Sequence, residues 1–261
     1  MYLKSHDADI LVSAFGAGPR TLLAHGGWVG SGELWAAPFE ILSRSWRTIT
    51  YDHRGTGATR CAAADISFEL LVEDLFRVLD ALQVQSCVLA AESMGAMIAF
   101  EAALRCPERF SGLVIVGGRY TGERTPARDR LIAGCKADFP ATMDAFVEAC
   151  APEEGCDAER AWGKMIVKRS NAVAAVQMME CVEHVDVQSR LHAIRVPTLI
   201  LHGSCDVISP LASSEKLVEL IPHAKLLVAD GVGHVPTITR PQWVAEQIQD
   251  FFAEPVNDRG C

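Results

Sequence analysis

Long basic and long apolar stretches are both missing from this sequence. Lys and Arg are scattered, with no run of five or more, and the formal net charge is −9. Since phosphate binding needs a concentrated basic surface, nucleic acid is not expected as a partner. No uninterrupted apolar segment is long enough to span a bilayer, and residues 1–9 contain no apolar stretch of signal-peptide length. We therefore expect a cytoplasmic protein that does not bind membranes.

The usual motifs for disulfide, metal and nucleotide chemistry are also absent. The nine cysteines are odd in number, none forms a C-x-x-C pair, and no group of Cys and His has zinc-ligand spacing. We expect free thiols in a reducing compartment and no metal site. There is no Walker A motif, and Gly16-Ala17-Gly18 lacks the further glycine of a dinucleotide-binding loop. A nucleotide-binding function is therefore disfavoured.

The 261 residues, 49% of them hydrophobic, are enough for one large core domain. Short apolar runs alternate with longer segments of helical periodicity. Strands are predicted at 9–14 and 20–25, as an opening pair, and at 47–52, 86–92, 112–118, 197–203 and 224–230. Helices are predicted at 67–82, 94–105, 210–220 and 241–252. This alternation implies the α/β class, with a mostly parallel sheet and helices on both faces.

The alternation is interrupted once, between residues 119 and 191. Helices are predicted there around 128–137, 142–149, 157–170 and 173–183, with no strand among them. We interpret this segment as a helical lid inserted above the sheet. The chain then divides into a core of residues 1–118 and 192–261 and a cap of residues 119–191. Residues 254–261 are predicted to form a polar, frayed tail.

The strongest chemical signal is the segment Ala91-Glu92-Ser93-Met94-Gly95, which follows an apolar strand and precedes a helix. It has the nucleophile-elbow pattern, with Ala91 in place of the first glycine. The serine of an elbow lies on a strained turn, so its neighbours must be small to let strand and helix approach. The helix N-terminus then offers free N–H groups to an oxyanion. A serine that only caps a helix is the alternative for this segment alone.

Asp206 and His234 are the predicted partners of Ser93. Asp206 lies three residues after a strand-ending glycine, at the carboxyl edge of the sheet, where open α/β sheets hold their sites. His234 lies in a glycine-bracketed loop after the last predicted strand. A serine needs an adjacent base, and a carboxylate fixes the tautomer of that base. A turn aspartate and a surface histidine are the alternatives when each residue is considered by itself.

The segment Ala24-His25-Gly26-Gly27-Trp28, also at a strand end, is the fourth signal. Acyl transfer needs two convergent N–H donors for the oxyanion. We predict that one is the Met94 amide, directly after the nucleophile, and that the other is the Gly27 amide, with Trp28 as the alternative. Glycine lets the backbone approach a substrate closely. His25 is interpreted as structural and not as a second base.

With these four segments the chain resembles the α/β-hydrolase superfamily, whose members share the order Ser93, Asp206, His234. It looks most like the lid-bearing branch of 3-oxoadipate enol-lactonases, small-ester esterases and meta-cleavage C–C hydrolases. The matching segments are 25–35, Asp52-His53-Arg54-Gly55-Thr56-Gly57, 91–96, 197–206 and 231–236. The resemblance implies an eight-stranded sheet, a helical lid after the sixth strand and no cofactor. Ala91 and Glu92 depart from the usual pattern, and Glu92 leaves the electrostatics beside the nucleophile open.

These observations predict a serine hydrolase of carboxylesterase or lactonase type that cleaves a small-molecule ester or lactone through an acyl-enzyme. C–C bond hydrolysis by the same triad and a ligand-sensing protein without turnover are the alternatives. The resemblance disfavours dehalogenases and epoxide hydrolases, which carry Asp at the position of Ser93. The chain is expected to be a monomer or a homodimer. Residues expected to bind substrate are Trp28, Arg119, Tyr120, Met178, Met179 and Val182. Packing within the lid is an equal alternative for Met178, Met179 and Val182. Arg119 could hold a carboxylate, but a plain surface arginine is the favoured alternative.

Overall fold

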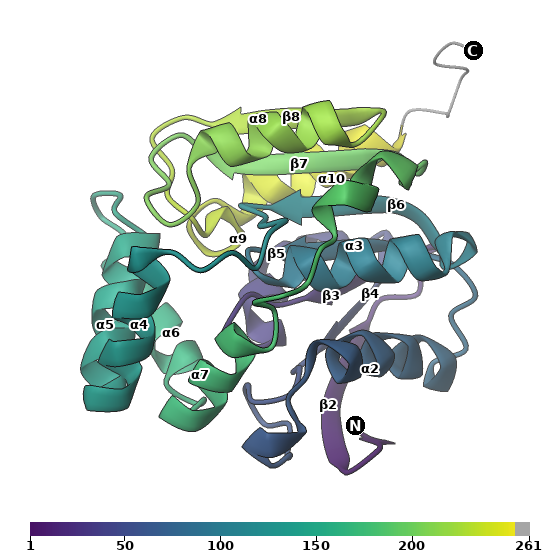
Figure 1. Ribbon diagram of the computed structural model, residues 1–261. Coiled ribbons are helices and arrows are strands. Elements are labelled where there is room, and N and C mark those ends of the chain that lie inside the picture. The colour runs from purple at the N-terminus through teal and green to yellow at the C-terminus, as the bar shows by residue number, and fades with distance from the viewer. Residues whose placement is uncertain (254–261) are drawn as a thin grey trace.

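An eight-stranded sheet forms the centre of the chain in the computed structural model, which describes residues 1–253. Its strands are β1 (Tyr2–Ser5), β2 (Ala8–Phe15), β3 (Arg20–His25), β4 (Trp46–Tyr51), β5 (Cys87–Glu92), β6 (Phe110–Val116), β7 (Thr198–Gly203) and β8 (Ala224–Ala229). They lie in the order β1-β2-β4-β3-β5-β6-β7-β8 (Figure 1). The pairs β1–β2 and β2–β4 are antiparallel, and the other pairs are parallel. The predicted mostly parallel eight-stranded sheet is therefore confirmed.

Helices cover both faces of this sheet. One face carries α2 (Phe68–Ala81), α3 (Gly95–Arg105) and α8 (Leu211–Leu220), and the other carries α1 (Ala36–Leu42) and α10 (Pro241–Ala253), which follows the short α9 (Pro236–Thr239). Because both faces are covered, every residue of β5 and β7 is buried. Short 3-10 turns lie at η1 (Gly32–Trp35), η2 (Ala63–Asp65), η3 (Pro107–Arg109) and η4 (Gln188–Ala193).

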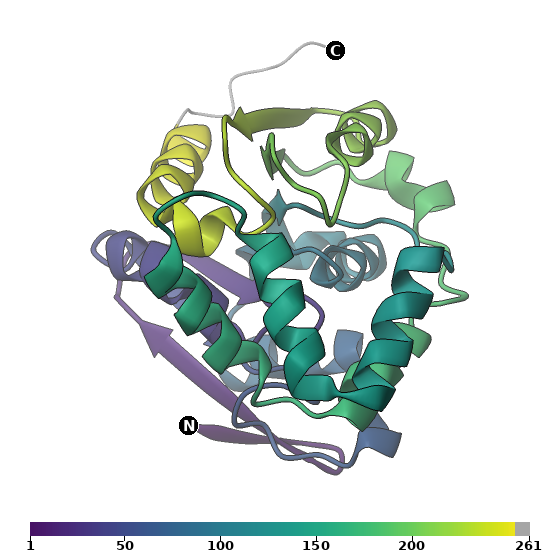
Figure 2. The same ribbon diagram turned by 90° about the vertical axis from the view of Figure 1, so that its left-hand side faces the viewer.

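Four further helices lie between β6 and β7 in the chain: α4 (Pro126–Ala137), α5 (Phe139–Cys150), α6 (Asp157–Val167) and α7 (Ala172–Glu180). They stand at the end of the sheet toward which β6 points, and Figure 2, viewed from that side, shows them in front of the strands (Figures 1 and 2). Thr125, Asp138 and Asn171 cap three of them, because each side chain accepts a hydrogen bond from the backbone N–H three residues later.

Several details differ from the sequence-based expectation. The edge strand β1 was not predicted, because its four residues, Tyr-Leu-Lys-Ser, contain no apolar run of strand length. The short helices α1 and α9 were not predicted either. The expected pairing of 9–14 with 20–25 is wrong: β4 lies between β2 and β3 and pairs with both. Residues 16–19 cross over the end of β4 to connect β2 with β3. These two strands are two strand spacings apart, about 10 Å, which four residues can bridge. The predicted tail at 254–261 lies outside the described residues.

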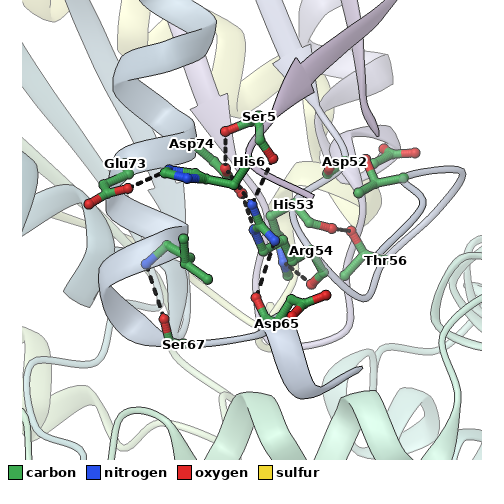
Figure 3. Close-up of polar contacts among 12 residues, drawn as sticks. Ser5, His6, Asp52, His53, Arg54, Thr56, Asp65, Ser67, Glu73 and Asp74 are labelled. Carbon is green, nitrogen blue, oxygen red and sulfur yellow. Dashed lines mark hydrogen bonds and ion pairs between the residues drawn. The ribbon is translucent and has the colours of Figure 1, made fainter. Parts of the chain in front are cut away.

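A buried ion pair joins the loop after β4 to helix α2 (Figure 3). The fully buried Arg54 guanidinium donates to Asp74 from Nε at 2.7 Å, and Nη2 donates to the carbonyl of Ser5 at 3.0 Å. Ser5 Oγ donates to the other oxygen of Asp74 at 2.6 Å, and Nη1 of Arg54 donates to the Asp65 carbonyl at 3.2 Å. Each charge is therefore paired and hydrogen-bonded, which a buried charge requires. The cluster fixes the loop that carries His53.

Asp74→Asn should destabilise the fold strongly, because it leaves the buried Arg54 charge without a counterion. Breaking such a pair lowers the free energy of unfolding by about 3–5 kcal/mol. The matched control is Asp80→Asn on the same helix, whose exposed pair with Arg109 should contribute less than about 1 kcal/mol. Urea unfolding of both variants measures the difference, and equal losses would contradict the assigned role of the Arg54–Asp74 pair.

Candidate active site

The predicted site residues meet at one edge of the sheet. Gly27 follows β3, Ser93 follows β5, Asp206 follows β7 and His234 follows β8. These four strands are neighbours or near neighbours in the parallel part of the sheet, so their carboxyl ends lie together. Residues from distant parts of the chain are therefore brought to the place where open α/β sheets hold their sites.

Ser93 occupies the tight turn between β5 and α3. Its backbone has a positive φ of 54°, the left-handed region that non-glycine residues rarely adopt. Its amide donates to the Val116 carbonyl of β6 at 2.9 Å, which anchors the turn to the sheet. Gly95 lets helix α3 come close, because a Cβ on Gly95 would lie 2.2 Å from the Gly26 carbonyl oxygen. The elbow therefore depends on small residues on both sides of the serine.

A continuous hydrogen-bonded line joins Ser93, His234 and Asp206. His234 Nε2 lies 2.9 Å from Ser93 Oγ, and His234 Nδ1 lies 2.7 Å from Asp206 Oδ2. Because the carboxylate only accepts, Nδ1 carries the proton and Nε2 is free to accept from the serine hydroxyl. All three side chains are buried. This geometry is suited to a general base that removes the serine proton.

Asp206 is held as a carboxylate despite its burial. Its Oδ1 accepts hydrogen bonds from the amides of Ile208 at 2.8 Å and Ser209 at 2.9 Å. Burial alone would raise the pKa of Asp206, but the hydrogen bond and charge of His234 and the Ser209 amide outweigh it, so the pKa lies below its ordinary value. An ionised Asp206 keeps the His234 ring in the tautomer that leaves Nε2 free.

The His234 loop is attached to the helical insertion. The His234 amide donates to the Cys150 carbonyl at the end of α5 at 2.7 Å. The Gly233 amide and the Thr239 hydroxyl both donate to Oε1 of Glu153, at 3.0 and 2.8 Å. The sequence analysis missed Glu153, which lies in the Pro/Gly/Glu stretch between two helices, and no local pattern marks it. The inserted helices therefore help to hold the histidine in place.

The loop after β3 passes directly beside the serine. A Cβ on Gly27 would lie 3.4 Å from Ser93 Cβ, so glycine permits this approach. His53 Nε2 donates to the Gly27 carbonyl at 2.9 Å, which links this loop to the Arg54 cluster. Within residues 1–253, the amides of Gly27 and Met94 donate to no protein acceptor. Both N–H groups are therefore available for an oxyanion.

His25 is buried beneath this loop and stacks on His53, with ring centroids 4.7 Å apart. Burial, followed by the neighbouring His53, lowers the pKa of His25 to about 3. The ring is therefore neutral at ordinary pH, and it contacts neither Asp206 nor His234 through a hydrogen bond. This arrangement agrees with the interpretation of His25 as a structural residue.

Two cavities meet at Ser93. The His234-side pocket, of about 550 Å³ including its open mouth, is lined mainly by Trp28, Leu34, Glu92, Val147, Val167, His234 and Ile238. The Arg119-side pocket, of about 480 Å³, is lined mainly by Met94, Met97, Arg119, Arg128, Leu131, Met179 and Val182. Trp28 and Phe146 line both pockets, with their rings perpendicular and 5.3 Å apart between centroids. Ser93 also lines both pockets.

Four of the six residues expected to bind substrate line these pockets: Trp28, Arg119, Met179 and Val182. Tyr120 and Met178 line neither. Met178 is fully buried and packs toward Gly55, where an added Cβ would lie 3.3 Å from its Cε. Sequence reasoning missed Phe146 and Arg128, because only the fold of the inserted helices brings them to the serine.

Glu92 has an unusual environment for a carboxyl group. It is almost completely buried, its Oε1 accepts from the Thr237 hydroxyl at 2.9 Å, and its Oε2 has no partner among the described residues. Burial raises the pKa of Glu92 to about 7, although nearby His234 and the Thr237 hydrogen bond oppose the shift. Glu92 therefore changes charge near neutral pH beside Ser93.

Other kinds of site are not found in the part of the chain that the structure describes. No cluster of three or more His, Cys, Asp or Glu side chains there could hold a metal ion. No helix within residues 1–253 has the length and apolar character needed to cross a membrane. The eight cysteines among these residues are free thiols.

The chain was compared with known proteins. Residues 20–238 match the family model described as serine aminopeptidase, S33. RutD of Azorhizobium caulinodans, which bears the provisional name carbamate hydrolase, is 29% identical, with 97% of this chain and 98% of that protein covered. A pimeloyl-[acyl-carrier protein] methyl ester esterase of Aeromonas hydrophila is 28% identical, with 93% and 99% covered.

Among solved structures, an esterase from Exiguobacterium antarcticum has a TM-score of 0.90 at 21% identity, covering 97% of this chain and 99% of its own. The enol-lactonase from Burkholderia xenovorans LB400 has a TM-score of 0.89 at 18% identity, covering 97% and 100%. At these identities the likeness shows the fold, which is that of the α/β-hydrolases.

Glu92→Gln should change how stability depends on pH. Because the folded chain holds the Glu92 proton more tightly than the unfolded chain, its contribution is present below about pH 4.5 and is lost as the pH rises to about 7. The free energy of unfolding of the wild type should therefore fall relative to Glu92→Gln by on the order of 2–3 kcal/mol between pH 5 and pH 8. Denaturant unfolding at a series of pH values measures this, with the exposed Glu108→Gln as control. Parallel curves for wild type and Glu92→Gln would contradict the prediction.

Proposed function

Because the chain belongs to the serine aminopeptidase S33 family of α/β-hydrolases, we propose that it is a serine hydrolase that cleaves a carboxylic ester or lactone of a small molecule. Family membership supports hydrolysis of small esters or amides in general. The narrower substrate class, carboxylic esters and lactones, is our proposal. The observation that carries it is the line from Ser93 Oγ through His234 to Asp206, with links of 2.9 and 2.7 Å. Ser93 is the nucleophile, His234 the base and Asp206 the acid that orients it.

The first half-reaction forms an acyl-enzyme. Ser93 Oγ bonds to the substrate carbonyl carbon while its proton moves to His234 Nε2. The carbonyl oxygen becomes an oxyanion and accepts hydrogen bonds from the Gly27 and Met94 amides, with Trp28 as an alternative donor. The tetrahedral intermediate then breaks its bond to the leaving oxygen, which takes the proton from His234. The alcohol leaves, or in a lactone remains tethered to the acyl group.

The second half-reaction returns the enzyme to its starting state. Water attacks the acyl carbon and gives a proton to His234 Nε2. The second tetrahedral intermediate breaks its bond to Ser93 Oγ, and His234 returns the proton to that oxygen. The carboxylic acid is released. No cofactor takes part in either step of this proposal.

The proposal also divides the chain into a hydrolase core of residues 1–118 and 192–261 and a cap of residues 119–191. Two observations support this division: α4–α7 lie between β6 and β7 in the chain, and they contribute Phe146 and Met179 to the pockets at Ser93. The cap would then select the substrate while the core carries out the chemistry. A cytoplasmic location and a monomeric or homodimeric state stay predictions from the sequence.

Ser93→Ala should abolish turnover and leave the fold intact, because the change removes only the nucleophilic oxygen. Loss of such a serine lowers kcat by roughly 10⁴–10⁶-fold. The test measures hydrolysis of p-nitrophenyl acetate and butyrate together with labelling by a fluorophosphonate probe. The wild type should be labelled at Ser93 and the variant should not, with Ser86→Ala, an exposed serine just before β5, as control. Full activity of Ser93→Ala would refute the nucleophile.

A substrate panel separates the proposed reaction from its alternatives. Small p-nitrophenyl esters and lactones should be cleaved with higher kcat/KM than amino acid p-nitroanilides or vinylogous 1,5-diketones. Preference for the diketones would favour C–C hydrolysis, and preference for the anilides would favour a peptidase. Ligand binding without turnover and without labelling of Ser93 would favour a ligand-sensing protein.

A further inference from the structure

The two pockets at Ser93 have different chemical neighbours, and this assigns a part of the substrate to each. In acyl transfer the leaving group takes its proton from the histidine, so it must lie on the histidine side of the serine. His234 lines one pocket and not the other. The Arg119-side pocket contains Ser93 and Met94 but not His234, so it is the place for the acyl arm. This assignment rests on the acyl-enzyme reaction proposed above.

The Arg119-side pocket carries an excess of positive charge. Arg119 and Arg128 both line it, and no Asp or Glu does. Within the described residues, the Arg119 side chain makes no hydrogen bond and no ion pair, although it is only partly exposed. Arg128 is 96% buried and leaves its Nε without a partner. The two guanidinium groups affect each other, since burial and then the charge of Arg128 lower the pKa of Arg119.

One carboxylate lies near these arginines, and it is shared. Glu183 Oε2 is 3.2 Å from Arg128 Nη2, and its Oε1 is 4.0 Å from Arg124 on the surface. Arg128 also donates from Nη1 to the carbonyl of Gly122 and from Nη2 to the carbonyl of Met179, which are both neutral. Among residues 1–253, Arg119 therefore has no counterion, although the net charge of the chain is −9. Burying part of an unpaired guanidinium costs desolvation free energy, which an anion can offset by pairing with it.

We propose that the Arg119-side pocket binds an acyl arm that ends in a carboxylate, so that the substrates are monoesters of short dicarboxylic acids. Met97, Leu131, Met179 and Val182 supply an apolar wall for the methylene groups of this arm. The guanidinium of Arg119 pairs with the terminal carboxylate, and the free Nε of Arg128 is a further donor. The ester alcohol leaves through the His234-side pocket.

The test compares charged and neutral acyl arms of equal size. The substrates are the monoethyl esters of succinic, glutaric and adipic acids, each paired with the ethyl ester in which a primary amide replaces the free carboxylate. Release of the acid product is measured by chromatography near pH 7.5. For at least one chain length the wild type should show a ratio of kcat/KM, charged over neutral, of about tenfold or more. A ratio near one at all three lengths would overturn the proposal.

Arg119→Met keeps the apolar stem and removes the charge, so it should lower this ratio at least about tenfold, mainly through KM. Arg119→Lys should give an intermediate ratio, because an ammonium cannot form the bidentate contact. The matched control is Arg124→Met, which removes an exposed arginine of the same segment that does not line the pocket. Its ratio should stay within about twofold of the wild type. An unchanged ratio in Arg119→Met would overturn the proposal.

A binding measurement separates this inference from the proposed reaction. Calorimetry on Ser93→Ala should detect glutarate or adipate, and the double variant Ser93→Ala/Arg119→Met should bind the same diacid at least about tenfold more weakly. If the wild type cleaves the neutral esters but Ser93→Ala binds no diacid, the proposed carboxylate site is wrong and the proposed hydrolase reaction is retained. If diacid binds through Arg119 but no ester is cleaved, the proposed reaction fails and the carboxylate site stands.

Discussion

The left-handed backbone at Ser93 is the constraint on which the rest of the site depends. A positive φ of 54° persists only where the surroundings hold it. Here the Val116 carbonyl fixes the Ser93 amide, and Gly95 brings α3 within reach of the Gly26 carbonyl. Among residues 1–253, the Met94 amide that follows this turn has no protein acceptor. A larger residue at position 95 would therefore disturb the proposed nucleophile and the proposed oxyanion donor together.

Rigid connections outside the turn determine where the partners of Ser93 lie. The buried pair of Arg54 and Asp74 fixes the loop after β4, and His53 in that loop holds the Gly27 carbonyl at 2.9 Å. From the other side, Cys150 and Glu153 of the helical insertion accept hydrogen bonds from the backbone amides of His234 and Gly233. The proposed base is thus coupled to the proposed cap, and the proposed oxyanion donor is coupled to the proposed core. A shift of the proposed cap would move the imidazole of His234 relative to Ser93.

Local patterns predicted seven of the eight strands and the three proposed triad residues, because apolar runs, strand ends and glycine loops are local in sequence. They did not distinguish Met178 from Met179. Adjacent helical residues point about 100° apart, so the rotation of α7 against the core decides which side chain faces the pocket. Arg128 was missed for a similar reason: its burial depends on the carbonyls of Gly122 and Met179, the second of them 51 residues away. Burial that arises from tertiary contacts has no signature in the chain.

The polarity of the two pockets follows from this arrangement. Glu92 borders the pocket that contains His234, and arginines border the pocket beyond Ser93. A substrate with one negative end would be repelled from the first side once Glu92 is ionised and attracted to the second. In the proposed reaction such a substrate enters in one orientation, with its leaving group against His234, the proposed proton donor. The proposed charge asymmetry then orients the ester as well as binding it, and orientation is a requirement of acyl transfer that the three proposed triad residues alone do not meet.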